Sequence, residues 1–382
     1  MYSLSGYGEM IADDVRTNAF VEAIRRTVTP GSVVLDIGTG TGFFALMACR
    51  SGARRVYAIE PSNVIDVARQ MAAANGCAGS IEFIQALSTD ISLPERVDVI
   101  VSDLRGVLPF FQNHIAAIAD ARQRFLAPGG VQIPRSDTLW LACVEAPDLH
   151  RSIASPWSDN KYGLDMRVAR DLLANQWCRA DVKPEQLMTL PGCCGSIDYS
   201  NIVNPGLHAK LRVDAKRAGT AHGICVWFDS ILADGIHFSN SPENPKLIYG
   251  SAFFPWPEPV TLNAGETIAI TLKGELIDGE YVWAWETVIQ RQPTSGGDSI
   301  HFRQSEFFGQ PMSLGQLRKL SASHVPVLNE GGKIDCLILK MMHEGTSLGD
   351  IASSLLSLHP LRFSRWQDAL TRVAKLSATY SC

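Results

Sequence analysis

A glycine-rich segment is the part of this 382-residue sequence whose residue types and spacing point most directly to chemistry. The apolar run Val33–Ile37 contains Asp36 and leads into Gly38, Gly40 and Gly42, after which a helix is expected. Glycines are favoured there because the backbone must turn tightly and lie against a ligand. The free N–H groups at the start of the helix can bind polar groups of that ligand. The pattern predicts a nucleotide-type cofactor site.

An acidic residue further along the chain supports the same prediction. Glu60 ends the next predicted strand, 20 residues after Gly40. A carboxylate at this place can accept hydrogen bonds from both ribose hydroxyls of a bound nucleoside. Because NAD-binding proteins use the same arrangement, the glycines and Glu60 do not by themselves choose between cofactors.

Short apolar runs alternate with amphipathic stretches between residues 32 and 134. This alternation predicts a parallel sheet with helices on both faces, and residues 1–30 also have helical periodicity. We therefore expect an α/β, Rossmann-like domain over residues 1–135. Its predicted strands are Val33–Ile37, Val56–Ile59, Ile81–Ile84 and Val97–Val101, and its predicted helices are Phe43–Ser51, Val64–Asn75 and Phe111–Leu126.

The pattern changes after Pro134. Short alternating segments separated by turns predict an antiparallel β-sandwich or β-barrel over residues 136–295, with a helical interruption at Met166–Ala174. The polar stretch QPTSGGDS is typical of a linker, and a small helical domain is expected over 315–382. The segments behind these predictions are Thr138–Cys143, Ile224–Phe228, Thr267–Leu272 and Tyr281–Val288 for strands, and Ile334–Met342, Leu348–Leu356 and Arg365–Leu376 for helices.

Composition excludes several classes of protein. With 46% hydrophobic and 19% charged residues the chain is globular, and a net charge of −5 argues against nucleic acid or an anionic membrane surface as a partner. No apolar run is long enough to span a membrane, and the N-terminus lacks the features of a signal peptide. The nine cysteines form no C-x-x-C pair and no His cluster has zinc-ligand spacing, so we expect reduced thiols, no metal and a cytoplasmic location.

The glycine-rich segment, read as D-x-G-x-G-x-G from Asp36, resembles motif I of class I methyltransferases. The resemblance implies S-adenosyl-L-methionine (SAM) as the cofactor. It also places Ser88 and Thr89, after the strand at 81–84, where such enzymes hold the adenine edge. An ordinary polar loop is the competing interpretation of these two residues.

The N-terminal segment YSLSGYGEMIADDVRT resembles the opening segment of the protein arginine methyltransferases. In that family the segment forms a helix that folds over the cofactor, which implies that Tyr7 and Met10 contact the cofactor and that Arg16 pairs with its methionine carboxylate. A guanidinium matches a carboxylate with two parallel hydrogen bonds.

The resemblance covers about residues 2–290. The run WSDNKYGLDMRVARDLL resembles the family's dimerisation arm, which implies a homodimer with an arm at about 155–185. The stretch FFPWPEPVTL resembles the family's Thr-His-Trp loop, although only Trp256 is kept and Phe254 and Pro255 replace the other two residues. The resemblance implies N-methylation of an arginine or related guanidine in a protein, peptide or small molecule.

The acceptor loop departs from the family pattern. The family uses S-E-W-M-G-Y-x-L-x-x-E, whose two glutamates clamp the acceptor guanidinium; here the loop is SDLRGVLPFFQ. Asp103 stands for the first glutamate, where it would orient the nucleophile, and the neutral Gln112 stands for the second. The loop has also gained Arg105. An unpaired buried charge costs about 3–5 kcal/mol, so an arginine held in the usual manner would bind poorly.

Three interpretations remain open for this loop. Another acid could take the place of the second glutamate, with Asp98, Glu258 and Glu286 as candidates by location. The acceptor could instead be a modified guanidine, an amide or a hydroxyl on a peptide or small molecule. Alternatively, the chain is a non-catalytic, SAM-binding dimeric scaffold.

The C-terminal stretch VPVLNEGGKIDCLILKMMHEGTSLGDIASSL resembles small winged-helix modules of the PqqD type, which recognise leader peptides. The expected order is an apolar strand, a helix, a turn at Gly345 and Thr346, and a second helix. The competing interpretation is a helical extension that only stabilises the protein.

Overall fold

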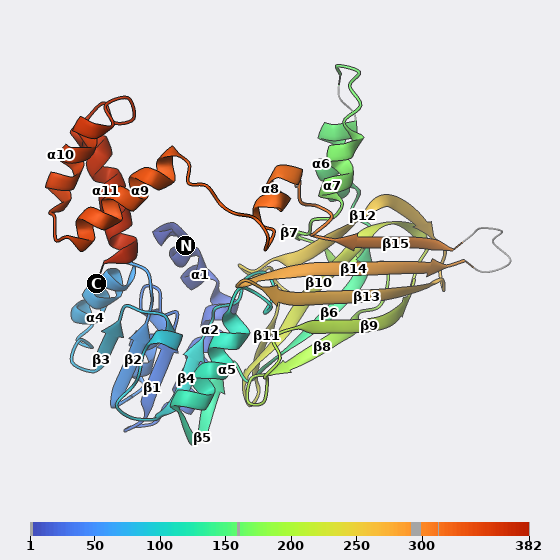
Figure 1. The fold of residues 1–382 in the computed structure, drawn as a ribbon. Helices are drawn as coiled ribbons and strands as arrows, with labels where there is room; N and C mark the ends of the chain where they lie inside the picture. Colours follow the sequence, from blue (N-terminus) through green and yellow to red (C-terminus); the bar gives the residue numbers. More distant parts are fainter. Residues whose placement is uncertain (1–2, 159–160, 292–298, 312, 382) are drawn as a thin grey trace. The chain divides into compact units, whose positions relative to one another are not determined.

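The computed structural model describes residues 3–158, 161–291, 299–311 and 313–381. The chain divides into two compact units, Met1–Gln310 and Pro311–Cys382. The first unit contains an α/β part and an antiparallel part (Figure 1).

The α/β part is built on a five-stranded parallel sheet with the order β3-β2-β1-β4-β5. The order reverses between β1 and β4, and in such sheets ligands bind in the crevice outside the carboxyl ends of the strands at that point. The four predicted strands are confirmed, and β5 is an additional strand whose Pro128, Gly129 and Gly130 break the expected apolar pattern. The elements are β1 (Val33–Ile37), β2 (Arg55–Ile59), β3 (Ile81–Ile84), β4 (Val97–Ser102), β5 (Leu126–Ile133), α3 (Phe43–Arg50), α4 (Ile65–Ala74), the short η1 (Ser88–Asp90) and α5 (His114–Phe125).

Two N-terminal helices precede this sheet, α1 (Leu4–Ala12) and α2 (Asp14–Thr27). The Asp13 side chain accepts a hydrogen bond from the Arg16 backbone N–H, at 3.1 Å, and so caps α2 where α1 ends. Helix α2 buries Phe20 and Ile24 in the core that joins the two parts of the unit. The first turn of α2 thereby directs Arg16 into the protein interior.

The antiparallel part consists of two sheets. One has the order β7-β12-β10-β6-β8, with β11 paired to β10, and the other has the order β15-β14-β13-β9. Phe254 of the first sheet packs against Trp283 and Trp285 of the second, with ring centroids 5.7 and 5.1 Å apart, so the core lies between the sheets. The strands are β6 (Ser136–Val144), β7 (Cys178–Ala180), β8 (Gly192–Asp198), β9 (Leu207–Asp214), β10 (Gly219–Ala233), β11 (Ile236–Ser239), β12 (Ser251–Leu262), β13 (Thr267–Ile277), β14 (Glu280–Gln290) and β15 (Ile300–Ser305).

The antiparallel part extends past the predicted boundary at 295. Strand β15 pairs with β14 over Ile300–Ser305, so the sheet continues beyond the predicted linker QPTSGGDS. Of that linker, residues 292–298 lie outside the described residues. Closure of the two sheets into one barrel stays a prediction.

A helical arm interrupts the antiparallel part between β6 and β7. It contains α6 (Pro147–Ser158) and α7 (Arg167–Leu173), and neither helix has a buried residue. The predicted helix at 166–174 is confirmed, and the arm begins earlier than the predicted 155. Figure 1 shows α6 and α7 standing out from the antiparallel sheets.

The C-terminal unit is helical and has its own core, made by Ile334, Ile338, Ile351, Leu355 and Val373. The predicted strand at its start is wrong, since the described residues 313–381 contain helices but no strand. Val325 and Val327 are 82% and 88% exposed, so this apolar segment does not pack as a strand of the core. The helices are α8 (Leu314–Lys319), α9 (Glu330–His343), α10 (Leu348–Leu358) and α11 (Trp366–Tyr380).

Within the described part of the chain, none of the helices is both long and apolar enough to cross a membrane. The same residues contain no group of three or more His, Cys, Asp or Glu side chains placed to hold a metal ion.

Candidate cofactor and acceptor site

The predicted glycine bend follows β1 and has the backbone that its glycines allow. Gly38, Gly40 and Gly42 have φ values of 73°, 54° and 84°. Residues other than glycine rarely adopt such positive φ values, because their Cβ atom clashes with the backbone. A Cβ on Gly40 would lie 2.4 Å from Tyr7 Cε1, and one on Gly38 would lie 2.2 Å from Leu104 Cδ2. The bend therefore presents bare backbone at the carboxyl end of β1, with the Tyr7 ring of α1 against it.

Asp36 holds the bend from inside. Its side chain is buried and accepts a hydrogen bond from the Thr39 hydroxyl at 2.6 Å. Burial raises the pKa of Asp36 to about 7, although the hydrogen bonds from Thr39 and the Ala45 backbone oppose the shift. Asp36 thus ties the start of the bend to the start of α3.

Glu60 lies against the same bend, where the spacing predicted an acid. One carboxylate oxygen accepts from the Gly40 backbone N–H at 3.2 Å, and the other accepts from the Ser62 N–H at 3.0 Å. Glu60 is buried, with 8% of its surface exposed. The acid and the glycines are therefore in direct contact, as a nucleoside site requires.

Ser88 and Thr89 lie in η1, after β3. Ser88 is buried, and its carbonyl accepts a hydrogen bond from Arg124 Nη2 at 2.6 Å. Thr89 is exposed and donates to Asp90 at 3.0 Å. Arg124 of α5 thus fixes the loop that carries both residues.

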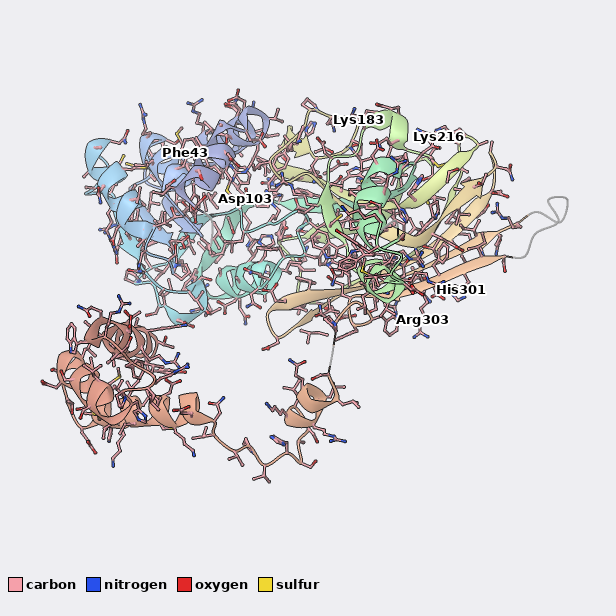
Figure 2. The ribbon with its side chains drawn as sticks, turned by 90° about the horizontal axis from the view of Figure 1, so that it is seen from above. Phe43, Asp103, Lys183, Lys216, His301 and Arg303 are labelled. Atoms are coloured by element: carbon pink, nitrogen blue, oxygen red, sulfur yellow. The ribbon has the colours of Figure 1, made fainter. Side chains whose placement is uncertain are left out.

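Asp103 follows β4 and is the centre of a buried ionic cluster. Its Oδ2 accepts from Arg16 Nε at 2.8 Å and from the Tyr249 hydroxyl at 2.6 Å, while its Oδ1 accepts from Arg105 Nε at 2.9 Å. Burial alone would raise the pKa of Asp103, but the charges of Arg105 and Arg16 and the Tyr249 hydrogen bond outweigh it and lower the pKa to about 2. Figure 2 shows Asp103 where the α/β part meets the antiparallel part.

Arg16, which the resemblance pairs with the methionine carboxylate of the cofactor, is bound to Asp103 in this structure. Arg16 Nη2 lies 2.5 Å from Asp103 Oδ2, and Arg16 Nη1 donates to the Met10 carbonyl at 3.1 Å. The Arg16 guanidinium also lies over the rings of Phe20 and Phe44, 5.4 and 5.3 Å from their centroids. Met10 contributes its backbone carbonyl to this arrangement.

Arg105 carries a fully buried charge in the same cluster. Besides Asp103, it donates from Nη1 to Asp137 Oδ1 at 2.9 Å and to the Ser230 hydroxyl at 2.7 Å. Burial would lower the pKa of Arg105, but the charges of Asp137 and Asp103 raise it well above its ordinary value, so the guanidinium stays charged. Four rings surround it at 5.3–5.7 Å from centroid to Cζ, those of Phe20, Phe228, Phe238 and Tyr249.

A second layer of side chains holds Asp137. The Tyr199 hydroxyl donates to Asp137 Oδ2 at 2.6 Å, and His114 Nε2 lies 3.1 Å from the same hydroxyl. Because the hydroxyl has one proton and donates it to Asp137, His114 Nε2 must be the donor to Tyr199. Burial and the charge of Arg105 lower the pKa of His114 to about 3, which keeps the imidazole neutral.

Several predicted residues do not join this cluster. Gln112 is exposed and donates to Glu280 at 3.3 Å. Trp256 is fully buried in β12, where it packs against Phe302 with ring centroids 5.8 Å apart. Tyr249, seven residues earlier, is the aromatic residue that reaches Asp103.

The three acids considered as substitutes for the second glutamate also lie elsewhere. Asp98 accepts from the Val33 N–H at 2.8 Å, Glu258 is exposed on β12, and Glu286 pairs with His301 at 2.6 Å on an exposed face. Figure 2 shows His301 on the side of the antiparallel part away from Asp103. Asp137, on β6, is instead the second carboxylate of the cluster. No local motif marked Asp137, because the strand that carries it belongs to a sheet formed by distant segments.

Comparisons with known proteins agree with this arrangement. Residues 34–130 match the model of a methyltransferase domain, and residues 135–276 match that of an arginine methyltransferase oligomerization subdomain. The chain is 32% identical over 254 residues to protein arginine N-methyltransferase 6 of Xenopus tropicalis, covering 63% of this chain and 74% of that protein. It is 28% identical over 272 residues to protein arginine N-methyltransferase 1 of Dictyostelium discoideum, covering 69% and 80%.

Another relative is longer. The chain is 29% identical over 246 residues to probable protein arginine N-methyltransferase 6 of Arabidopsis thaliana, which is 62% of this chain but only 55% of that protein. Among solved structures, the Trypanosoma brucei PRMT1 enzyme–prozyme heterotetrameric complex with AdoHcy has a TM-score of 0.71 at 22% identity, covering 78% of this chain and 97% of that chain. Arabidopsis thaliana protein arginine methyltransferase 10 has a TM-score of 0.69 at 24% identity, covering 79% and 97%. These two structures share the fold.

The parallel sheet, the glycine bend and the adjoining Glu60 define a SAM-dependent methyltransferase domain, followed by an antiparallel sheet domain. The cofactor is S-adenosyl-L-methionine, as the motif predicted. The chain belongs to the protein arginine methyltransferase family, and the resemblance drawn from its sequence is confirmed.

Proposed function

We propose that this chain transfers a methyl group from SAM to a nitrogen of an arginine or related guanidine group in a protein, a peptide or a small molecule. One observation carries the proposal beyond family membership. Two buried carboxylates, Asp103 and Asp137, and four aromatic rings enclose a guanidinium, that of Arg105, after the carboxyl end of β4. We call the space that this guanidinium fills the acceptor pocket. The pocket has the charge and shape that a guanidine acceptor needs.

The residues around the bend would hold the cofactor. The bare backbone at Gly38, Gly40 and Gly42 would lie against it, and Glu60 would accept hydrogen bonds from the ribose hydroxyls. We assign Tyr7 and Met10 to its cover, Asp36 to the support of the bend, and Ser88 and Thr89 to the adenine edge. Arg16 would bind the methionine carboxylate, which requires it to share or release Asp103.

When bound, the cofactor would supply a methyl group on a sulfonium, whose carbon–sulfur bond would break as the bond to the acceptor nitrogen forms. The part of Asp103 is to orient the acceptor nitrogen. Beside Arg105 and Arg16 the pKa of Asp103 is lowered to about 2, so the carboxylate is ionised at neutral pH and can accept hydrogen bonds from a guanidinium. The proton lost by the acceptor nitrogen passes to solvent water. Gln112 and Trp256, which the family resemblance places on the acceptor side, are not part of the proposed pocket, because Gln112 is exposed and Trp256 is buried in β12.

We also propose a homodimer, formed through the arm of α6 and α7. The arm exposes apolar side chains in a region that matches the oligomerization subdomain, with Tyr162 and Val168 73% and 77% exposed. The net charge of −5 disfavours nucleic acid and anionic membranes as partners. We propose a cytoplasmic location because every cysteine in the described residues is unpaired, as in a reducing compartment.

The test is a transfer assay with radiolabelled SAM, arginine-containing peptides and ethylguanidine as acceptors. Labelled product supports the proposal, and its absence with a chain that binds S-adenosylhomocysteine contradicts it. That second outcome would favour the other candidate function, a non-catalytic SAM-binding dimeric scaffold. The observation that favours the scaffold is the one that Arg105 already fills the two-carboxylate pocket.

A further inference from the structure

The contacts of Arg105 reproduce those expected of a bound acceptor. A guanidinium acceptor needs two carboxylates, and Arg105 has Asp103 at 2.9 Å from Nε and Asp137 at 2.9 Å from Nη1. Its side chain is fully buried, at 0% exposure, and both carboxylates are at least nine-tenths buried. Neither interaction is a surface ion pair that solvent would weaken.

The surroundings of Arg105 come from four separate parts of the first unit. Phe20 belongs to α2, Phe228 and Ser230 to β10, Phe238 to β11, and Tyr249 to the loop before β12. The rings also pack on one another; Phe238 and Tyr249 are stacked with centroids 5.9 Å apart. Such a set of rings is a preformed cage for a flat cation, because ring faces attract positive charge.

One nitrogen of Arg105 has no partner among the described residues. Nη2 is buried and makes no hydrogen bond, whereas Nε and Nη1 make three between them. A buried donor without a partner is costly, so its presence needs an explanation. The two carboxylates and Ser230 accept hydrogen bonds from Nε and Nη1 of Arg105, but the surrounding side chains offer no acceptor to Nη2.

Charge balance prevents a second guanidinium from joining the first. The cluster has two carboxylates, Asp103 and Asp137, and two cations, Arg16 and Arg105. An acceptor arginine would enter as a third cation. Arg16 would free one oxygen of Asp103 when it pairs with the methionine carboxylate, but Asp137 and the other oxygen of Asp103 would still be paired with Arg105. A buried cation without its own partners is strongly unfavourable. The acceptor can bind only if Arg105 gives up the pocket.

We propose that Arg105 is an internal ligand of the acceptor pocket and a specificity-determining residue, which competes with guanidine acceptors for Asp103 and Asp137. The inference rests on the proposed function, because it assigns the pocket to that acceptor. The apparent affinity for an acceptor equals its intrinsic affinity reduced by the fraction of chains in which Arg105 has left the pocket. The native chain should therefore have a high KM for ethylguanidine or an arginine peptide. A shorter side chain at position 105 should lower this KM.

The experiment compares the full-length chain with Arg105→Ala and Arg105→Lys. In Arg105→Ala the pocket is empty, so we expect the KM for ethylguanidine to fall at least tenfold. Lysine holds one carboxylate as a point charge and loses the planar fork, so Arg105→Lys should lie between the two. Arg135→Ala is the control, because Arg135 pairs with Asp234 on the surface. The KM of this variant for ethylguanidine should equal that of the native chain.

A binding measurement keeps the inference separate from the proposed function. Ethylguanidinium chloride at low millimolar concentration should raise the Tm of Arg105→Ala, and equal ethylammonium or sodium chloride should not. If S-adenosylhomocysteine binds but no variant transfers methyl groups, this rescue still decides the inference, while the proposed function fails. If Arg105→Ala does not fold, the KM of Arg105→Lys decides it. A KM in either folded variant that equals or exceeds the native value, or no selective rise in Tm, would overturn it.

Discussion

Asp137→Asn tests the buried cluster that the proposed site depends on. Asp137 is 0% exposed and accepts from Arg105 at 2.9 Å and from Tyr199 at 2.6 Å. Asparagine keeps the volume but removes the charge, so Arg105 would share the single carboxylate of Asp103 with Arg16. Breaking a buried pair by neutralising one partner costs about 3–5 kcal/mol. Because Asp103 remains, we expect the lower end, about 3 kcal/mol.

The assay is urea unfolding followed by tryptophan fluorescence. All tryptophans except Trp366 lie in residues 1–310, so the signal reports mainly on the first unit. Asp234→Asn is the matched control: it neutralises the partner of Arg135, but the Asp234 side chain is 90% exposed, and its unfolding midpoint should stay at the native value. If Asp137→Asn leaves the midpoint and slope of unfolding unchanged, the pair of Arg105 with Asp137 does not stabilise the first unit.

Two further predictions concern pH and the C-terminal unit. The pKa of Asp103 is lowered to about 2, so its contribution to stability is complete above its unfolded value near 4 and is lost as the pH falls toward 2. The loss is about 2 kcal/mol, and acid titration of the unfolding free energy should show it in the native chain but not in Asp103→Asn. Removing residues 311–382 should leave the unfolding midpoint of the first unit and its affinity for S-adenosylhomocysteine unchanged, since the C-terminal helices have their own core. A large loss of either on deletion would contradict the division into units, and retained binding of a candidate peptide would contradict a leader-peptide role for this unit.

The elements of the α/β part were predictable because their signals are local. A buried parallel strand is a short β-branched run, and β1 and β3 begin and end where that pattern does. The glycine bend and Glu60 were predictable for the same reason, since both lie next to strand ends in the chain. The strand expected before α9 was wrong because apolar residues alone do not pair a strand.

The acceptor pocket was not predictable in the same way. Asp103 and Arg105 follow β4, but Asp137, Ser230 and Tyr249 come from the antiparallel part, and the pocket exists only when its sheets pack against α2. The sequence comparison with the family loop drew attention to Gln112, which the structure places at the surface. The second carboxylate belongs to Asp137 on β6, 32 residues from Arg105 in the chain. No rule of residue spacing predicts that these two side chains meet.

The proposed cofactor site and the proposed methyl transfer both require that the chain binds the cofactor, which titration calorimetry with S-adenosylhomocysteine measures. We expect saturable binding by the native chain and an affinity at least tenfold weaker in Glu60→Ala, because that change removes the proposed acceptor for the ribose hydroxyls. Glu95→Ala is a suitable control. Glu95 pairs with Arg54 at a distance of 2.5 Å, and this pair is not part of the glycine bend. Absence of binding heat for the native chain, or equal affinities for native and Glu60→Ala chains, would show that the glycine bend and Glu60 do not form the cofactor site.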